Sequence, residues 1–333
     1  MSWAEVYGHD TQRQRLENAA TRGRLAHAYL FVGPAGIGKH RFALELAKLL
    51  LCERRGSAWE ACDRCAACVQ VQANTHPDFL TACKTEDKLE FTIDVVRGMT
   101  AQLALRPIRG GRKVTIIEDA DDFNEEAANC FLKTLEEPPD GAMLILLATS
   151  IERQLPTILS RCQVLRFQRL DDVAMENLLA RTDAVAAELI PQLIRLSQGS
   201  VGRAVALADE TVRECRTRTI QQLGAARPNA VELARNWIEC LEEAGKESAS
   251  QRERATRLMA LVGSILGDAL RIQQGLPATE PSENDPIQLI ADRCTEDHLL
   301  QHLEATVEAE RLIDRRVPLP LIMEQLAQKL CTA

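Results

Sequence analysis

Residues 33–40 read GPAGIGKH and match a phosphate-binding loop at every defined position except the last. In such a loop the glycines let backbone N–H groups close around phosphates, and the lysine, here Lys39, neutralises the β- and γ-phosphates. The glycines of the pattern are Gly33, Gly36 and Gly38. The last position normally carries a hydroxyl that binds Mg²⁺, but this chain has His40. Because Mg²⁺ prefers oxygen ligands in octahedral geometry, we expect phosphate binding with weak or absent ATP hydrolysis by the chain alone.

The strand-like run 113–118 ends in a pair of acids, as the second element of an ATPase site would require. The usual order is Asp then Glu, in which the first carboxylate holds Mg²⁺ through water and the second polarises the attacking water. Here Glu118 and Asp119 stand in the reverse order. The side chain at the general-base position is therefore one methylene shorter, and a displacement of about 1 Å can cost about a hundredfold in rate. The alternative is that these acids only terminate a strand.

Four of the 11 cysteines are spaced for a metal, in the pattern C-x9-C-x2-C-x2-C. They are Cys52, Cys62, Cys65 and Cys68. Four thiolates at such spacings can close a tetrahedral zinc site and leave no position for water, so the zinc would be structural. The alternatives are free surface thiols, an iron–sulfur cluster, or His76 in place of one thiolate.

The composition is that of a helix-rich globular protein, with 46% hydrophobic and 26% charged residues among 333. The net charge of −8 argues against a chain that coats DNA by bulk electrostatics, so we expect any DNA contact to be local. One local basic group comprises Arg106, Arg109, Arg112 and Lys113, for which a solvated loop is the alternative. No apolar run approaches membrane-spanning length and no secretory signal opens the chain, so we expect a cytoplasmic protein.

Residues 1–168 alternate apolar runs with helical periodicity, which predicts an α/β domain with a parallel sheet and flanking helices. The expected strands are 28–32, 79–82, 113–118, 143–148 and 163–167. Strand-like runs then disappear. We expect a small all-α domain at 169–208 and a larger all-α domain at 209–333.

Four motifs and the inserted cysteines together resemble bacterial DNA polymerase III clamp-loader subunits. The motifs are the phosphate loop, NCFLKTLEEPP at 129–139, ATS at 148–150 and SRC at 160–162. The resemblance covers residues 1 to about 208. It implies an AAA+ module with a zinc insert at about 52–68, a lid at 169–208 and a C-terminal helical collar at 209–333 that joins five subunits in a ring.

The resemblance also implies roles for single residues. Arg161 is the arginine finger that reaches a neighbouring subunit's ATP site, where such a group is worth about 10³ to 10⁵ in rate. Thr149 or Ser150 is the sensor at a strand end, and the sequence does not choose between them. Arg203 is the candidate lid arginine, displaced by one residue from the motor-subunit pattern, which on a helix is a rotation of about 100°.

Two kinds of subunit in this family differ in their own ATP sites. The γ/τ motor keeps the hydroxyl and the Asp-Glu pair, whereas the δ′ subunit keeps the zinc insert and SRC arginine while its own site decays. His40, the reversed acids and the shifted Arg203 favour the δ′ kind.

The implied function is assembly with motor γ/τ and δ subunits to load the sliding clamp onto primed DNA in replication, within the DNA polymerase holoenzyme. The alternatives are an ATP-hydrolysing γ/τ-like motor and a zinc-dependent DNA-binding module, and the acidic charge counts against the latter. Whether ATP with Mg²⁺ is bound or hydrolysed stays open at this point.

Overall fold

The computed structural model describes residue 3 and residues 6–56, 59–83, 91–109, 111–182, 185–245 and 248–332. The chain divides into two compact units. The first comprises Met1–Leu178 with Gly199–Val201, and the second comprises Leu179–Gln198 with Gly202–Ala333. Within the described ranges, no helix is both long enough and apolar enough to cross a membrane.

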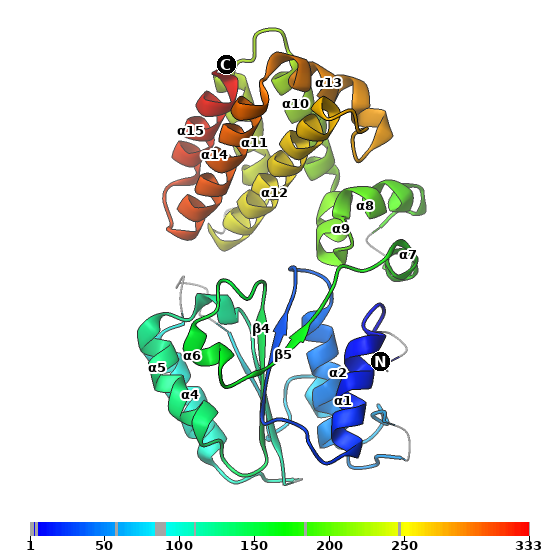
Figure 1. The fold of residues 1–333 in the computed structure, drawn as a ribbon, viewed down its shortest axis with the longest axis vertical. Helices are drawn as coiled ribbons and strands as arrows, with labels where there is room; N and C mark the ends of the chain where they lie inside the picture. Colours follow the sequence, from blue (N-terminus) through cyan, green and yellow to red (C-terminus); the bar gives the residue numbers. More distant parts are fainter. Residues whose placement is uncertain are drawn as a thin grey trace. The chain divides into compact units, whose positions relative to one another are not determined.

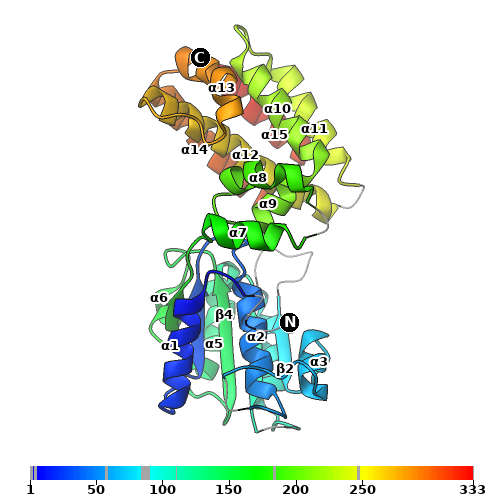
Figure 2. The same ribbon diagram turned by 90° about the vertical axis from the view of Figure 1, so that its right-hand side faces the viewer.

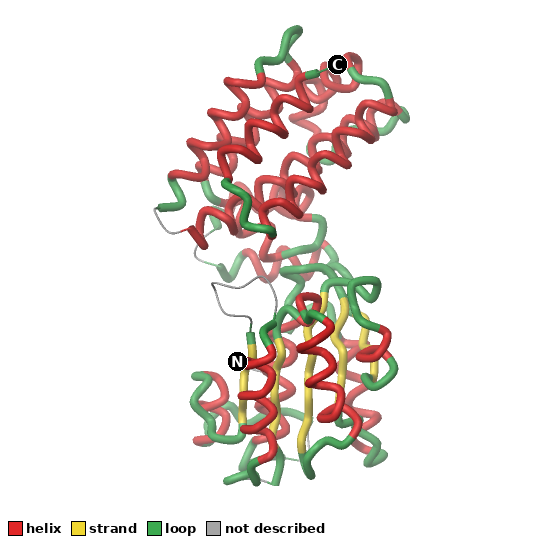
Figure 3. Tube along the Cα trace, turned by 90° about the vertical axis from the view of Figure 1, so that its left-hand side faces the viewer, coloured by secondary structure: helices red, strands yellow, loops and turns green. Residues whose placement is uncertain are grey.

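A five-stranded parallel sheet forms the centre of the first unit (Figure 3). Its strands are β1 (Ala28–Val32), β2 (Phe79–Ala82), β3 (Lys113–Ile117), β4 (Ala142–Ala148) and β5 (Gln163–Arg166). The strand order is β2-β3-β4-β1-β5. Every residue of β1, β3 and β4 is buried, which explains why these strands read as continuous runs rather than alternating patterns. The predicted parallel sheet is confirmed, with strand ends within one residue of those expected.

Helices cover both faces of this sheet (Figure 1). They are α1 (Asp10–Thr21), α2 (Lys39–Leu51), α4 (Ile93–Ala104), α5 (Glu125–Glu136) and α6 (Pro156–Leu159). Helix α3 (Ala66–Gln72) packs against α2, and α7 (Asp172–Leu179) follows β5 along the chain. Alternate residues of β1 point to different cores: Phe31 packs with Phe42 of α2, and Leu30 packs with Phe131 of α5. The sheet therefore separates α1 and α2 from α4, α5 and α6.

The second unit is helical in its described residues (Figure 2). Its α-helices are α8 (Ile190–Ser197), α9 (Val201–Ala208), α10 (Glu210–Gly224), α11 (Ala230–Glu242), α12 (Ser248–Gln273), α13 (Asn284–Arg293), α14 (Glu296–Asp314) and α15 (Leu319–Cys331). Helix α12 packs against α13 and α14, while α11 packs against α10 and α15. Trp237 is fully buried and its indole N–H donates to Thr219 Oγ1 at 3.0 Å, so the large ring is packed without an unpaired donor. The all-α prediction for this part of the chain is confirmed.

Candidate functional site: a phosphate loop, a surface arginine and a cysteine cluster

The phosphate loop lies between β1 and the first residue of α2, the strand-loop-helix context that a nucleotide site requires. Gly36 and Gly38 adopt φ values of 73° and 98°, a region that side chains with a Cβ rarely enter. A Cβ on Gly33 would lie 2.4 Å from the carbonyl oxygen of Phe167. All three glycines are therefore needed for the path of the loop.

Lys39 is the first residue of α2, and its side chain is directed back into the loop. Its ammonium donates to the carbonyls of Gly33 and, at 2.7 Å, of Pro34. Burial lowers the pKa of Lys39 to about 8, against the opposing effect of Asp121 and Asp119. At neutral pH the loop therefore holds a cation that has lost most of its water.

Two side chains outside the motif bond two further loop carbonyls. His9 Nε2 lies 2.8 Å from the carbonyl oxygen of Ile37, which only accepts, so this nitrogen carries the hydrogen. Ser200 Oγ donates to the carbonyl of Ala35 at 3.0 Å. Within the described ranges, the backbone N–H groups of residues 35–38 donate to no carbonyl. Side chains thus bond four of the loop carbonyls while the amides remain for an anion, which is the arrangement of a phosphate nest.

His40 and Glu118 lie next to one another, with His40 Nε2 3.4 Å from Glu118 Oε1. Both side chains are partly exposed, at 49% and 40%. These are the positions whose side chains hold Mg²⁺ in a hydrolysing phosphate loop. The following residue, Asp119, adopts a left-handed φ of 50° and precedes the short 3₁₀ helix η2 (Ala120–Asp122).

Asp121 connects this acidic segment to the end of β4. Its Oδ2 accepts from the backbone N–H and the hydroxyl of Thr149 at 2.6 and 2.7 Å, and its Oδ1 accepts from Gln154 at 2.7 Å. Ser150 instead accepts from the backbone N–H of Arg153 at 3.3 Å. Of the two sensor candidates, Thr149 is thus the one bonded to the acids that follow β3.

Arg161 follows α6 and is fixed by neighbours on its own face of the sheet. Its Nε donates to Glu136 Oε1 at 2.8 Å and its Nη2 to the same oxygen. Its Nη1 donates to the Thr157 carbonyl and to Ser160 Oγ, both at 2.9 Å. The side chain retains 31% exposure. Because α6 packs in the core on one side of the sheet and α2 in the core on the other, Arg161, which follows α6, lies on the side of the sheet opposite α2.

The four predicted cysteines come together in one cluster. All Sγ atoms of Cys52, Cys62, Cys65 and Cys68 lie within 4.8 Å of one another. The Cys52–Cys65 and Cys62–Cys68 sulfurs are 4.0 Å apart. Zinc bonds of about 2.3 Å in a tetrahedron would place sulfurs about 3.8 Å apart, so the cluster fits the ion. His76 is not a member of the cluster.

Comparison with known proteins places the chain in a family. Residues 8–171 match the family model described as DNA polymerase III, delta subunit. The chain is 38% identical over 220 residues to the DNA polymerase III subunit delta′ of Pseudomonas aeruginosa, which covers 65% of this chain and 67% of the relative. The chain belongs to the DNA polymerase III delta′ family.

Two further relatives extend this finding. The delta′ subunit of Escherichia coli is 29% identical over 279 residues, covering 84% of this chain and 79% of that protein. The tau subunit of Escherichia coli is 32% identical over 217 residues, covering 63% of this chain but 33% of tau. The resemblance read from the motifs is confirmed.

In this delta′ family member, a buried ion cluster joins the cysteine segment to α2. Lys48 Nζ lies 2.7 Å from Asp63 Oδ1 and 2.7 Å from Glu45 Oε1. Lys48 and Glu45 are 1% and 2% exposed. Burial opposes the charge of Lys48, but the two carboxylates outweigh it and raise its pKa. Asp63 lies between Cys62 and Cys65 in the sequence, so the ion cluster attaches the cysteine segment to α2, the helix that starts in the phosphate loop.

Two of the four basic residues at 106–113, Arg109 and Lys113, have partners within the fold. The buried carboxylate of Asp78 accepts from the backbone N–H groups of Ile108 and Arg109, at 2.8 and 2.7 Å. Arg109 also lies 3.8 Å from Glu53. Lys113 is buried and donates to the Gln102 carbonyl at 2.6 Å. Lys113 is therefore not part of a surface patch.

The candidate lid arginine, Arg203 of α9, donates to the Ala260 carbonyl of α12 at 3.3 Å.

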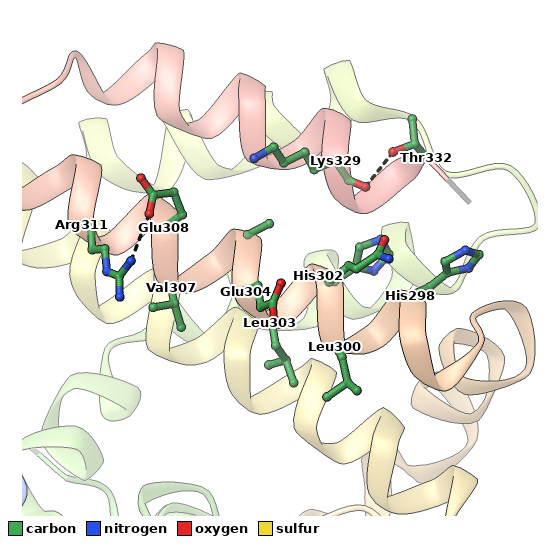
Figure 4. A pocket seen from close by; sticks show the side chains of 12 residues that line it. His298, Leu300, His302, Leu303, Glu304, Val307, Glu308, Arg311, Lys329 and Thr332 are labelled. Atoms are coloured by element: carbon green, nitrogen blue, oxygen red, sulfur yellow. Dashed lines mark hydrogen bonds and ion pairs between the residues drawn. The ribbon is translucent and has the colours of Figure 1, made fainter.

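An open groove of about 920 Å³ runs along α14 to the end of α15, where Thr332 Oγ1 donates to the Lys329 carbonyl (Figure 4). None of the site residues predicted from the sequence lines this groove.

Proposed function

We propose that this delta′ family member is a clamp-loader subunit that assembles with motor γ/τ and δ subunits to load the sliding clamp onto primed DNA. In this proposal it donates Arg161 to a neighbour's ATP site, while its own ATP site no longer supports hydrolysis. The observation that carries the proposal is the placement of Arg161. The guanidinium is part-exposed, held by Glu136, and on the face of the sheet opposite α2, so it is available to another subunit.

The chemistry of such an arginine is electrostatic. A guanidinium presented to the γ-phosphate stabilises the negative charge that grows in the transition state and needs no protonation step, because arginine stays charged. A fixed side chain also loses less entropy when it meets the phosphate.

The test uses the reconstituted loader with its motor subunits, clamp and primed DNA. Arg161→Ala should abolish DNA-stimulated ATP turnover at the neighbouring site, a loss of about 10³-fold or more, and leave assembly intact. Arg97→Ala is the matched control, because Arg97 is an exposed arginine of α4 on the same side of the sheet. Wild-type ATP turnover in the loader that carries Arg161→Ala would contradict the role of Arg161 as an arginine finger.

We also assign a structural Zn²⁺ to the four-cysteine cluster. Each of Cys62, Cys65 and Cys68 donates its backbone N–H to the sulfur of the preceding ligand, at 3.4, 3.3 and 3.5 Å. Such bonds stabilise thiolates and orient them toward a metal. Four sulfur ligands leave no coordination position for a substrate, so the ion holds the segment together and takes no part in a reaction.

The competing function is a γ/τ-like motor that hydrolyses ATP. The complete glycine set and the nest of free amides favour it, since both serve a phosphate. Purified chain that turned over ATP with Mg²⁺, and lost this activity on Lys39→Ala, would establish the motor. ATP binding without turnover is the result that our proposal expects.

A further inference from the structure

The side chains near the phosphate loop do not fit Mg²⁺. A motor loop offers a hydroxyl and a carboxylate to the ion, whereas this loop offers the imidazole of His40. The carboxylate that would assist, Glu118, faces that imidazole at 3.4 Å. Asp121 is engaged by Thr149 and Gln154. The protein thus supplies the phosphate contacts of a nucleotide site, whereas the hydroxyl ligand of the metal is absent and the nearest carboxylate faces an imidazole.

We propose that this loop binds a nucleoside di- or triphosphate without Mg²⁺, and that His40 donates to the terminal phosphate in the place of the ion. The inference rests on the proposed degenerate ATP site and specifies which form of the nucleotide that site takes. His40 is the second residue of α2, so its side chain leaves the same helical turn as Lys39.

Three groups replace the missing charge of the metal. The free N–H groups of residues 35–38 and the positive end of the α2 dipole favour an anion. Lys39 adds a buried cation that exchanges its loop carbonyls for phosphate oxygens. The first turn of α2 contains no acidic residue, and Glu118 lies against the imidazole of His40. Asp121 and Asp119 act on Lys39 electrostatically and favour its charged form.

Binding in this form does not lead to hydrolysis. In phosphoryl transfer the metal bridges the β- and γ-oxygens and neutralises the developing charge, and His40 has a single donor for that task. The nucleotide would then stay bound through the cycle as a structural ligand of the first unit.

Isothermal titration calorimetry of the full chain with ATP, and separately with ADP, tests the proposal. The titrations compare buffer containing Mg²⁺ with magnesium-free buffer lacking any chelator, so that the cysteine cluster keeps its metal. We expect affinity at least as high without Mg²⁺ as with it. His40→Ala should weaken binding in magnesium-free buffer by about tenfold or more, the loss of a hydrogen bond to a charged group.

The variant His40→Thr restores the hydroxyl and should make binding tighter with Mg²⁺ than without it. His298→Ala, a histidine of α14 in the second unit, is the control and should bind as the parent does. Loss of wild-type binding on removing Mg²⁺, or no binding in either buffer, would overturn the inference. Neither result touches the role of Arg161, because a finger in trans needs no nucleotide on the subunit that donates it.

Discussion

Glu136 and Arg161 meet through a single carboxylate oxygen, which accepts hydrogen bonds from both Nε and Nη2 of the arginine. Glu136 is the last residue of α5 and Arg161 follows α6, so the contact joins two adjacent helices across 25 positions of sequence. Half of the Glu136 side chain is exposed, which limits what the ion pair adds to folding. Its effect is on where the guanidinium points.

We therefore predict that Glu136→Ala lowers DNA-stimulated kcat of the reconstituted loader by about tenfold to a hundredfold, because the arginine loses its fixed direction. The KM for ATP and the stability of the chain should change little, since an exposed ion pair contributes about 1 kcal/mol or less. Glu136→Gln keeps an acceptor and should recover most of the turnover. Wild-type kcat in the alanine variant would show that Arg161 needs no such partner.

The cysteine cluster predicts about one equivalent of zinc in the purified chain. Cys65→Ser should lose the ion, because a serine hydroxyl does not replace a thiolate, and should lower the unfolding temperature of the first unit. Metal analysis and a colorimetric zinc-release assay give the stoichiometry. Cys83→Ser is the matched control, since Cys83 is exposed and outside the cluster. Zinc retained in full by the Cys65 variant would contradict the assignment.

We predict that removing the charge of Lys48 strongly lowers the free energy of unfolding. Lys48→Met keeps most of the volume but leaves Glu45 buried without its cation, a loss of about 3–5 kcal/mol in the free energy of unfolding. Burial already raises the pKa of Glu45, so the variant can relieve the charge by taking up a proton. The deficit should therefore shrink as the pH falls.

Urea unfolding of the full chain measures this effect. In a Trp237→Phe background the remaining tryptophans, Trp3 and Trp59, both lie in the core of the first unit and report on it selectively. The double variant Lys48→Met/Glu45→Gln removes both buried charges and should be more stable than the single one. Equal losses of unfolding free energy in the single and the double variant would mean that lost packing, and not the unpaired charge of Glu45, destabilises the protein.

Nucleotide binding should depend on pH through Lys39. Its pKa of about 8 means that the ammonium is present below this value and is lost as the pH rises through it. We expect constant affinity for ADP from about pH 7 to 7.5, where the phosphate, with its pKa of about 6, is already ionised. By pH 9 affinity should fall by up to about tenfold, one pKa unit above the midpoint. In calorimetric titrations, Lys39→Met should bind weakly with no such step. A wild-type profile that stayed flat to pH 9 would show that Lys39 does not supply the charge.

Local sequence patterns were sufficient for the sheet, the loop and the cysteines. Buried parallel strands read as apolar runs, and the glycine and cysteine motifs each lie within a short segment. His9, Ser200 and Asp121 were not predicted as site residues. Ser200 reaches a loop carbonyl across 165 positions, and hydrogen bonds to carbonyls impose no spacing on the sequence.

The charge pattern of the sequence suggested a surface position for Lys113, which is buried, and gave no sign of the buried ion cluster around Lys48. Lys113 belongs by sequence to a basic group, yet its position at the start of a central strand buries it. Lys48 lies in an apolar helical pattern, and only the fold places Asp63 against it. Burial of a charged side chain depends on its partners, which the local sequence does not contain.

Helix α2 begins at Lys39 of the phosphate loop, and Cys52 of the four-cysteine cluster comes immediately after its last residue. The length of α2 therefore fixes the distance and the relative rotation between the phosphate loop and the cysteine cluster. Removing one residue from α2 would turn one end against the other by about 100° and shorten the span by about 1.5 Å. A deletion within these 13 residues would therefore disturb both ends of the helix together, whereas a single substitution acts only where its side chain lies.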